Sequence, residues 1–103
     1  MTEQARLYGT VLYELKLPET MIRTCESILR ENPQLAQVLK SPVIRQNKKE
    51  TIIDRVFQSP DFSRNMRNFL KKICEAGCSD QMEDMVRIRE EKSREAAGIL
   101  SAK

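Results

Sequence analysis

Apolar residues recur with the period of an amphipathic helix along most of the chain, and breaks in the pattern divide it into six segments. The first three run from about residue 2 to 15, 18 to 31 and 33 to 41. The next two run from about residue 45 to 57 and 61 to 77, and a sixth begins near residue 80. No run of alternating β-branched residues lies between turn dipeptides, so no sheet is expected. The pattern predicts an all-α fold, a compact six-helix bundle.

Prolines mark the ends of the early helices. Pro18 suits the first turn of the second helix, where its missing N–H is not needed. Asn32-Pro33 breaks the chain and restarts it as the third helix, which Ser41-Pro42 ends. These breaks predict three short helices within the first 42 residues.

The last two helices have cap signals of their own. Ser59-Pro60-Asp61 supplies both a break and a cap before the fifth helix. Gly77 follows its last apolar residue, where a left-handed glycine can end a helix. Ser79 or Asp80 is expected to cap the sixth helix, with Glu83 completing a capping box. The stretch 68–77 is therefore predicted to be an amphipathic helix with a marked stop.

The apolar stripes also predict the core. In chain order they contain Tyr8, Val11, Leu12, Leu15, Met21, Ile22, Cys25, Ile28, Leu29, Leu35, Val38, Leu39, Ile52, Ile53, Val56, Phe57, Phe62, Met66, Phe69, Leu70, Ile73, Met82, Met85 and Val86. The first helix is apolar on more than one narrow face because Leu7 and Tyr13 widen its stripe. Such a helix can serve both the core and a partner.

Composition narrows the class of protein. A chain of 103 residues with 40% hydrophobic and 32% charged residues is long enough for one small folded domain. No apolar run approaches the roughly 20 residues that cross a bilayer, and the N-terminus lacks a signal-peptide pattern, so a cytosolic location is expected. The three cysteines are expected to be reduced thiols, because an odd set without an export signal does not indicate a disulfide framework.

Residues that carry catalysis or bind cofactors are scarce. Histidine is absent, and Cys74 and Cys78, although four residues apart, lack the further ligands of a structural zinc site. The glycines at positions 9, 77 and 98 cannot form a phosphate-binding loop. The acid pairs 83–84 and 90–91 lie in mixed-charge helical surface. We therefore expect no catalytic residues, no cofactor and no metal.

Nucleic-acid binding is also disfavoured. The net charge is only +3, acids are interspersed with the bases, and aromatic residues make up 5% of the chain. The basic group considered comprises Arg45, Lys48, Lys49, Arg55, Arg64, Arg67, Lys71 and Lys72. The remaining interpretation is a helical interaction module.

Three stretches of the sequence, in order along the chain, are similar to the motifs of one protein family. Residues 5–15, Ala-Arg-Leu-Tyr-Gly-Thr-Val-Leu-Tyr-Glu-Leu, are similar to the opening helix of that family. Residues 68–77 are similar to its Asn-Phe-Leu-x-Leu-Leu-x-Glu-Asn-Gly pattern. Between them, residues 39–44 followed by Lys48-Lys49 resemble a Leu-x-x-Pro-x-Ile segment with a lysine after it. Three matches in order are more specific than any one, and together they make the chain resemble the delta subunit family of F-type ATP synthases, called oligomycin-sensitivity-conferring protein in mitochondria.

The resemblance implies a fold, a function and partners. It covers the N-terminal half of a full-length member, with residues 1–95 as the helical bundle domain and 96–103 as the start of the connection to a C-terminal domain. It implies a non-catalytic peripheral-stalk subunit that holds the N-terminal helix of the alpha subunit at the top of the catalytic head. The b subunits would be contacted through the C-terminal domain. The bacterial form would lie at the cytoplasmic face of the cell membrane, touching the membrane only through the complex.

In the family the alpha helix binds between the first and fifth helices. Carried over to matching positions, the partner-binding residues are Leu7, Tyr8, Val11 and Leu15 on one side and Phe69, Lys72, Ile73 and Ala76 on the other. Periodicity alone leaves open which of them belong to the core. Cys78 replaces the family's arginine, Gly9 an alanine and Lys72 an apolar residue, and Arg89 lies near a usual aromatic. The alternative from another class is a small helical regulatory or nucleic-acid-binding module.

Overall fold

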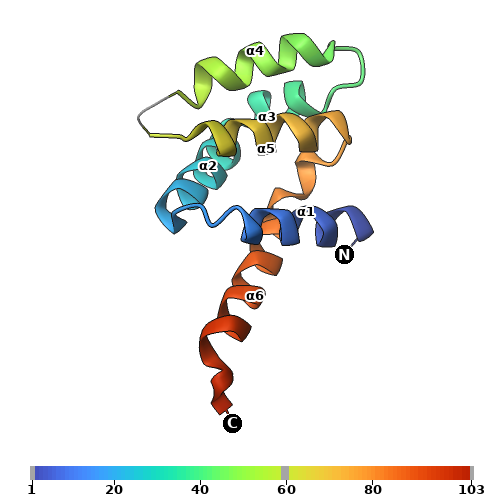
Figure 1. The fold of residues 1–103 in the computed structure, drawn as a ribbon. Helices are drawn as coiled ribbons and strands as arrows, with labels where there is room; N and C mark the ends of the chain where they lie inside the picture. The colour runs from blue at the N-terminus through green and yellow to red at the C-terminus, as the bar shows by residue number, and fades with distance from the viewer. Residues whose placement is uncertain (1, 59–60, 103) are drawn as a thin grey trace.

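The computed structural model describes residues 2–58 and 61–102, with side chains described up to residue 96. Within this part the chain forms helices and no strand, which confirms the predicted all-α bundle (Figure 1). The elements are α1 (Glu3–Glu14), α2 (Glu19–Glu31), α3 (Pro33–Lys40), α4 (Gln46–Val56), α5 (Arg64–Glu75), the 3-10 turn η1 (Ser79–Gln81) and α6 (Met82–Ala102).

The helices pack mainly in pairs. Helix α1 crosses α6 and makes its most extensive contact there, while α4 lies along α5 at the outer edge of the bundle (Figure 1). Helix α6 continues beyond the other helices, which gives the molecule a long axis of 49 Å and a radius of gyration of 14.0 Å. Segment 96–102, predicted as the start of a connection, continues this helix.

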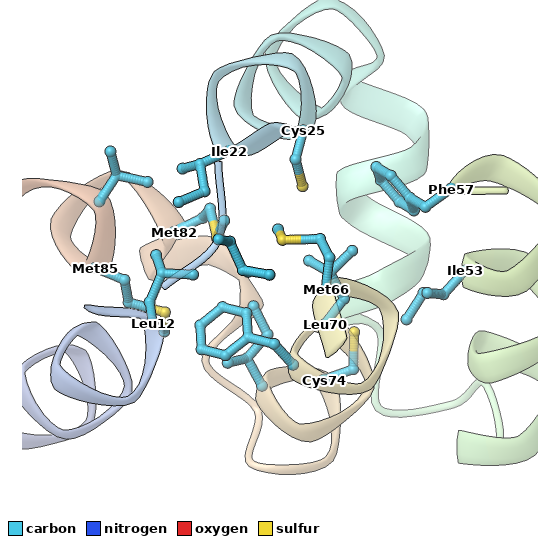
Figure 2. Packing of buried hydrophobic residues seen from close by; sticks show 14 of the residues in the cluster. Leu12, Ile22, Cys25, Ile53, Phe57, Met66, Leu70, Cys74, Met82 and Met85 are labelled. Carbon is cyan, nitrogen blue, oxygen red and sulfur yellow. The ribbon is translucent and has the colours of Figure 1, made fainter. Parts of the chain in front are cut away.

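The core is formed by residues from every helix (Figure 2). Leu12 of α1, Ile22 of α2, Leu39 of α3 and Ile53 of α4 are fully buried or nearly so, as the apolar stripes predict. The buried cluster consists of Leu12, Leu17, Ile22, Cys25, Leu39, Ile53, Phe57, Phe62, Met66, Phe69, Leu70, Ile73, Cys74, Cys78, Met82, Met85 and Val86. Val56 was predicted to be buried, and this is wrong. Its side chain is 40% exposed because α4 packs on one side only.

The start of α5 differs from the prediction. Ser63 is the N-cap, and its hydroxyl accepts a hydrogen bond from the N–H of Met66 at 3.2 Å. The predicted cap at 59–61 is therefore wrong, with residues 59–60 outside the described part and Asp61 two positions too early. Arg67 fixes the entry by donating to the carbonyls of Phe57 at 3.2 Å and Phe62 at 2.9 Å.

The start of α6 also differs. Ser79 and Asp80 lie in the turn η1, and α6 begins at Met82, so the predicted cap and capping box are wrong. The carboxylate of Asp80 pairs with Lys40 Nζ of α3 at 2.9 Å. That of Glu83 lies 3.9 Å from Arg30 Nη2. Asp80 therefore links η1 to α3, and Glu83 links α6 to α2.

The predicted glycine stop of α5 is confirmed. Gly77 has φ +75°, in the left-handed region. The N–H of Gly77 donates to the carbonyl of Cys74 at 3.1 Å, and the N–H of Cys78 donates to that of Ile73 at 3.0 Å. These two bonds form a Schellman motif, which satisfies carbonyls that the end of a helix leaves free. Cys78 then packs into the core, so the stop also positions the turn toward α6.

Replacing Gly77 by alanine is expected to lower the free energy of unfolding by about 1 kcal/mol, because a β-carbon disfavours the left-handed conformation. An added β-carbon would meet no heavy atom within 4 Å, so the loss comes from the backbone alone. Lys16, after α1, has φ 53°. As the matched reverse change, Lys16→Gly should therefore stabilise by about 0.5 kcal/mol. Urea denaturation of both variants measures the two changes in the free energy of unfolding. Changes of the same sign in the two variants would contradict this interpretation.

Candidate functional site

The two helices that carry the motifs are linked by contacts between a few side chains. The rings of Tyr8 on α1 and Phe69 on α5 pack edge to face, with centroids 6.4 Å apart and an interplanar angle of 71°. One turn earlier on α1, Gln4 Nε2 donates to the carbonyl of Ala76 at 3.3 Å. Thr2 caps α1, and its hydroxyl also contacts the amide oxygen of Gln81. The start of α1 is thus fixed against the end of α5 and η1.

The residues predicted on α1 form one continuous side of that helix. Tyr8, Val11 and Leu15 are half-buried and pack against the core cluster, while Leu7 is 59% exposed. Their spacings of three, four and seven residues place them on one side. Leu12 and Gly9 point to the core and to α6 instead. This side of α1 therefore combines apolar groups anchored in the core with an exposed leucine.

The residues predicted on α5 divide between core and surface. Ile73 is fully buried and Phe69 is 4% exposed, so both are core groups in this structure. Ala76 is half-buried and Lys72 is exposed. Of the predicted α5 residues, Ala76 and Lys72 are thus the two that are not buried, and Phe69 contacts Tyr8 of α1. We name Leu7, Tyr8, Val11, Leu15, Phe69, Lys72 and Ala76 the α1–α5 surface.

Two residues at this surface were not predicted. Gln4 joins α1 to α5 through its bond to Ala76. Asn65 is exposed and lies four residues before Phe69 and seven before Lys72, which places it on the same side of α5. The seven-residue spacing could have identified Asn65, whereas the contact of Gln4 depends on how the two helices cross.

The charges on α5 differ in how far they are neutralised. Lys71 Nζ lies 2.9 Å from the carboxylate of Asp54, and Arg67 Nε lies 3.7 Å from it. Lys72 forms no salt bridge within residues 2–58 and 61–102. It lines a hollow of about 290 Å³ with Glu50 and Asn68, among others. Lys72 is thus exposed, and the hollow that it lines opens toward α4, to which Glu50 belongs.

The thiols are poorly suited to chemistry at neutral pH. Burial, assisted by the carboxylate of Glu26, raises the pKa of Cys25 to about 12. Burial likewise raises the pKa of Cys74 to about 11 and that of Cys78 above its ordinary value. A protonated, buried thiol is a weak nucleophile and a poor metal ligand. In the described part of the chain, His, Cys, Asp and Glu do not gather in groups of three or more that could hold a metal ion.

The hollow between α2 and α6 is crossed by ion pairs that join the two helices. It measures about 180 Å³ and is lined by Ile22 and Val86 together with acids and arginines of both helices. Arg23 reaches Glu19 at 3.5 Å and Glu90 at 3.6 Å, and Arg89 reaches Glu19 at 3.9 Å. The Arg23–Glu90 and Arg89–Glu19 pairs join the two helices across the hollow, whereas the Arg23–Glu19 pair lies within α2.

The described residues form an all-α helical bundle domain. Comparison with family models gives a match to the ATP synthase delta (OSCP) subunit over residues 9–103. The chain therefore belongs to the ATP synthase delta (OSCP) family, whose members are structural subunits of the ATP synthase peripheral stalk. The match includes the 68–77 motif and begins within the 5–15 motif. Comparisons with curated proteins and with solved structures give no match.

None of the helices in the described residues combines the length and the apolar character needed to span a bilayer. Membership in the family places the chain in a membrane-associated ATP synthase complex.

Proposed function

We propose that this chain is the adapter of the stator, binding the N-terminal helix of an alpha subunit across the α1–α5 surface. In this role it resists rotation of the catalytic head and has no active site of its own. It would act at the top of the head, on the cytoplasmic face of the cell membrane in a bacterial enzyme. Residues 1–95 would form the binding domain, and 96–103 would begin the connection to a domain that contacts the b subunits.

The contact between Tyr8 and Phe69 is the observation that carries this proposal. It joins the two motif-bearing helices, so that their flanking apolar residues form one surface. An amphipathic helix is recognised by such an apolar strip between two helices and requires no catalytic group. Leu7, with 59% of its surface exposed, is the most exposed large apolar residue of that surface.

Lys72 supplies a charge at the rim of the same surface. A charged rim around an apolar centre contributes more to orientation and association rate than to affinity. We therefore assign Lys72 the role of pairing with an acidic residue of the alpha helix, while Leu7, Val11 and Leu15 provide the contact area.

Titration of the chain with a peptide of the cognate alpha subunit N-terminus tests the proposal. Amide chemical shifts should change along α1 and α5, and α2 and α3 should stay unchanged. Leu7→Asp should weaken binding about 10- to 100-fold, because burying one leucine is worth about 1.5–3 kcal/mol. The chain should remain folded, since Leu7 is exposed.

Val43→Asp is the matched control. Val43 is 87% exposed in the loop between α3 and α4 and belongs to neither of the two helices that carry the α1–α5 surface. Its variant should bind the peptide as the parent chain does. Equal losses in the two variants, or no binding of the parent at high micromolar peptide, would count against the proposal.

A further inference from the structure

Helix α4 has a side that faces away from α5. Residues 45, 48, 52, 55 and 56 fall on this side, because their spacings match the turns of a helix. Arg45, Lys48 and Arg55 are exposed, Val56 is 40% exposed and Ile52 is half-buried. We name these five residues the α4 stripe. Figure 1 shows α4 at an edge of the bundle, with α5 next to it.

The acids of α4 lie on the α5 side instead. Asp54 pairs with Lys71 at 2.9 Å. Glu50 accepts a hydrogen bond from Gln46 Nε2 at 3.1 Å, and the same amide donates to the carbonyl of Lys71 at 3.0 Å. The two carboxylates of α4 thus have partners within the bundle.

The cations of the α4 stripe differ from these carboxylates in their pairing within the bundle. In the part of the chain that the structure describes, Arg45, Lys48 and Arg55 form no salt bridge and no side-chain hydrogen bond. Arg45 occupies the N-cap position of α4, but its side chain makes no capping hydrogen bond. Lys48 lies in the first turn of α4, which contains no acidic residue. The N-terminal end of a helix carries a partial positive charge, which these cations reinforce. A negatively charged partner group placed here would therefore be stabilised by the cations and by the helix dipole.

The positive charge of the whole chain is concentrated in this region. Residues 45–75 contain eight basic and four acidic residues, a net charge of +4. The whole chain has a net charge of +3, so the remaining residues together have a net charge of −1. Residues 45–56, which comprise Arg45 and α4, have four basic and two acidic residues, a net charge of +2, and residues 64–75 of α5 have four basic and one acidic residue, a net charge of +3. The positive charge is therefore shared by these two neighbouring helices.

We propose that the α4 stripe is a docking surface for an acidic amphipathic helix of a partner protein. Carboxylates of the partner pair with Arg45, Lys48 and Arg55, and its apolar side packs on Ile52 and Val56. The stripe spans about 15 Å, the length of about three helical turns. The two apolar residues of the stripe favour a protein helix over a nucleic acid as the ligand. The stripe also contains no aromatic residue that could stack on bases. This proposal is independent of the one for the α1–α5 surface.

A designed helical peptide with glutamates on one side and leucines on the other tests this inference on the 103-residue chain. The control peptide has lysine in place of each glutamate. We expect the glutamate peptide to bind at least about tenfold more tightly and to shift the amide signals of α4, with affinity that falls as salt rises. Equal binding of the two peptides, or shifts confined to other helices, would overturn the proposal.

Paired variants locate the site. Lys48→Glu with Arg55→Glu should weaken the glutamate peptide at least about tenfold. Lys92→Glu with Arg94→Glu makes the same change in net charge on α6 and should leave binding within about twofold. Equal losses would show attraction by net charge alone and overturn the proposal. The milder Ile52→Ala provides a second readout, and unchanged peptide affinity in that variant would also overturn it.

Competition separates this surface from the one proposed for the alpha subunit. The alpha-subunit peptide should bind the Lys48→Glu, Arg55→Glu chain as it binds the parent, and should not displace the glutamate peptide. Displacement would place both ligands on one surface and overturn the inference. Tighter binding of a single-stranded oligonucleotide or of anionic lipid vesicles at α4, with displacement of the glutamate peptide, would overturn it in favour of those ligands.

Discussion

Phe57→Ala is expected to lower the free energy of unfolding by about 3–5 kcal/mol, the range for truncating a buried phenylalanine. Phe57 follows the last turn of α4 and is fully buried. Its ring packs edge to face on Phe62, with centroids 5.0 Å apart. Because α4 packs mainly on α5, this ring is a principal anchor of the helix on the bundle. A chain of this size has about 5–15 kcal/mol of stability in total, so the loss is large.

Val56→Ala is the adjacent control, since its side chain is 40% exposed. We expect it to lose less than about 1 kcal/mol. Guanidinium denaturation of the parent and both variants measures the difference. A loss for Phe57→Ala no larger than that for Val56→Ala would contradict the packing described for α4.

Gly9→Ala is expected to lower the free energy of unfolding by about 1–3 kcal/mol, although alanine favours a helix by about 1 kcal/mol over glycine. A β-carbon at position 9 would lie 2.7 Å from Ile88 Cβ, 2.9 Å from Ile88 Cγ2 and 3.1 Å from the carbonyl oxygen of Met85. These atoms belong to the crossing of α1 and α6, so one helix must shift. Because α1 also carries Tyr8, the shift should weaken the alpha-subunit peptide as well.

A double-mutant cycle with Ile88→Ala provides the check. Removing the γ-carbons of Ile88 relieves part of the clash, so the two changes together should cost less than the sum of their separate costs. Thr10→Ala, one residue along the same helix, should stay within about 0.5 kcal/mol of the parent. Simple additivity of Gly9→Ala and Ile88→Ala would contradict the close approach at this crossing.

Much of the fold follows from local rules. The apolar periodicity predicts the six helices, and it places the bounds of the first five within a few residues because proline breaks and a glycine stop separate their stripes. It does not predict the end of α6, which continues to Ala102. The Gly77 stop was predictable, since a glycine after the last apolar residue has few other roles. The start of α5 was less predictable because Ser59, Asp61 and Ser63 are all acceptable caps within five positions, and local chemistry does not select among them.

The site required tertiary information. Periodicity places Leu7 and Ile73 on apolar stripes alike, yet one is 59% exposed and the other fully buried. The difference arises from how α1 lies across α5 and α6, which no local pattern contains. The exposure of Val56 has the same origin, because a helix at the edge of a bundle is covered on fewer sides than its stripe predicts. Gly9 stands where alanine is usual, and its close contact with Ile88 explains the absence of a side chain.

Photo-crosslinking in the assembled ATP synthase tests the central claim most directly. A crosslinking residue is introduced at position 7 or 72, on the α1–α5 surface, or at position 24, an exposed control on α2. We predict that positions 7 and 72 crosslink to the N-terminal segment of an alpha subunit and that position 24 does not. Crosslinks from positions 7 and 72 to other subunits only, or an equal yield with the alpha segment from position 24, would contradict the proposed binding surface.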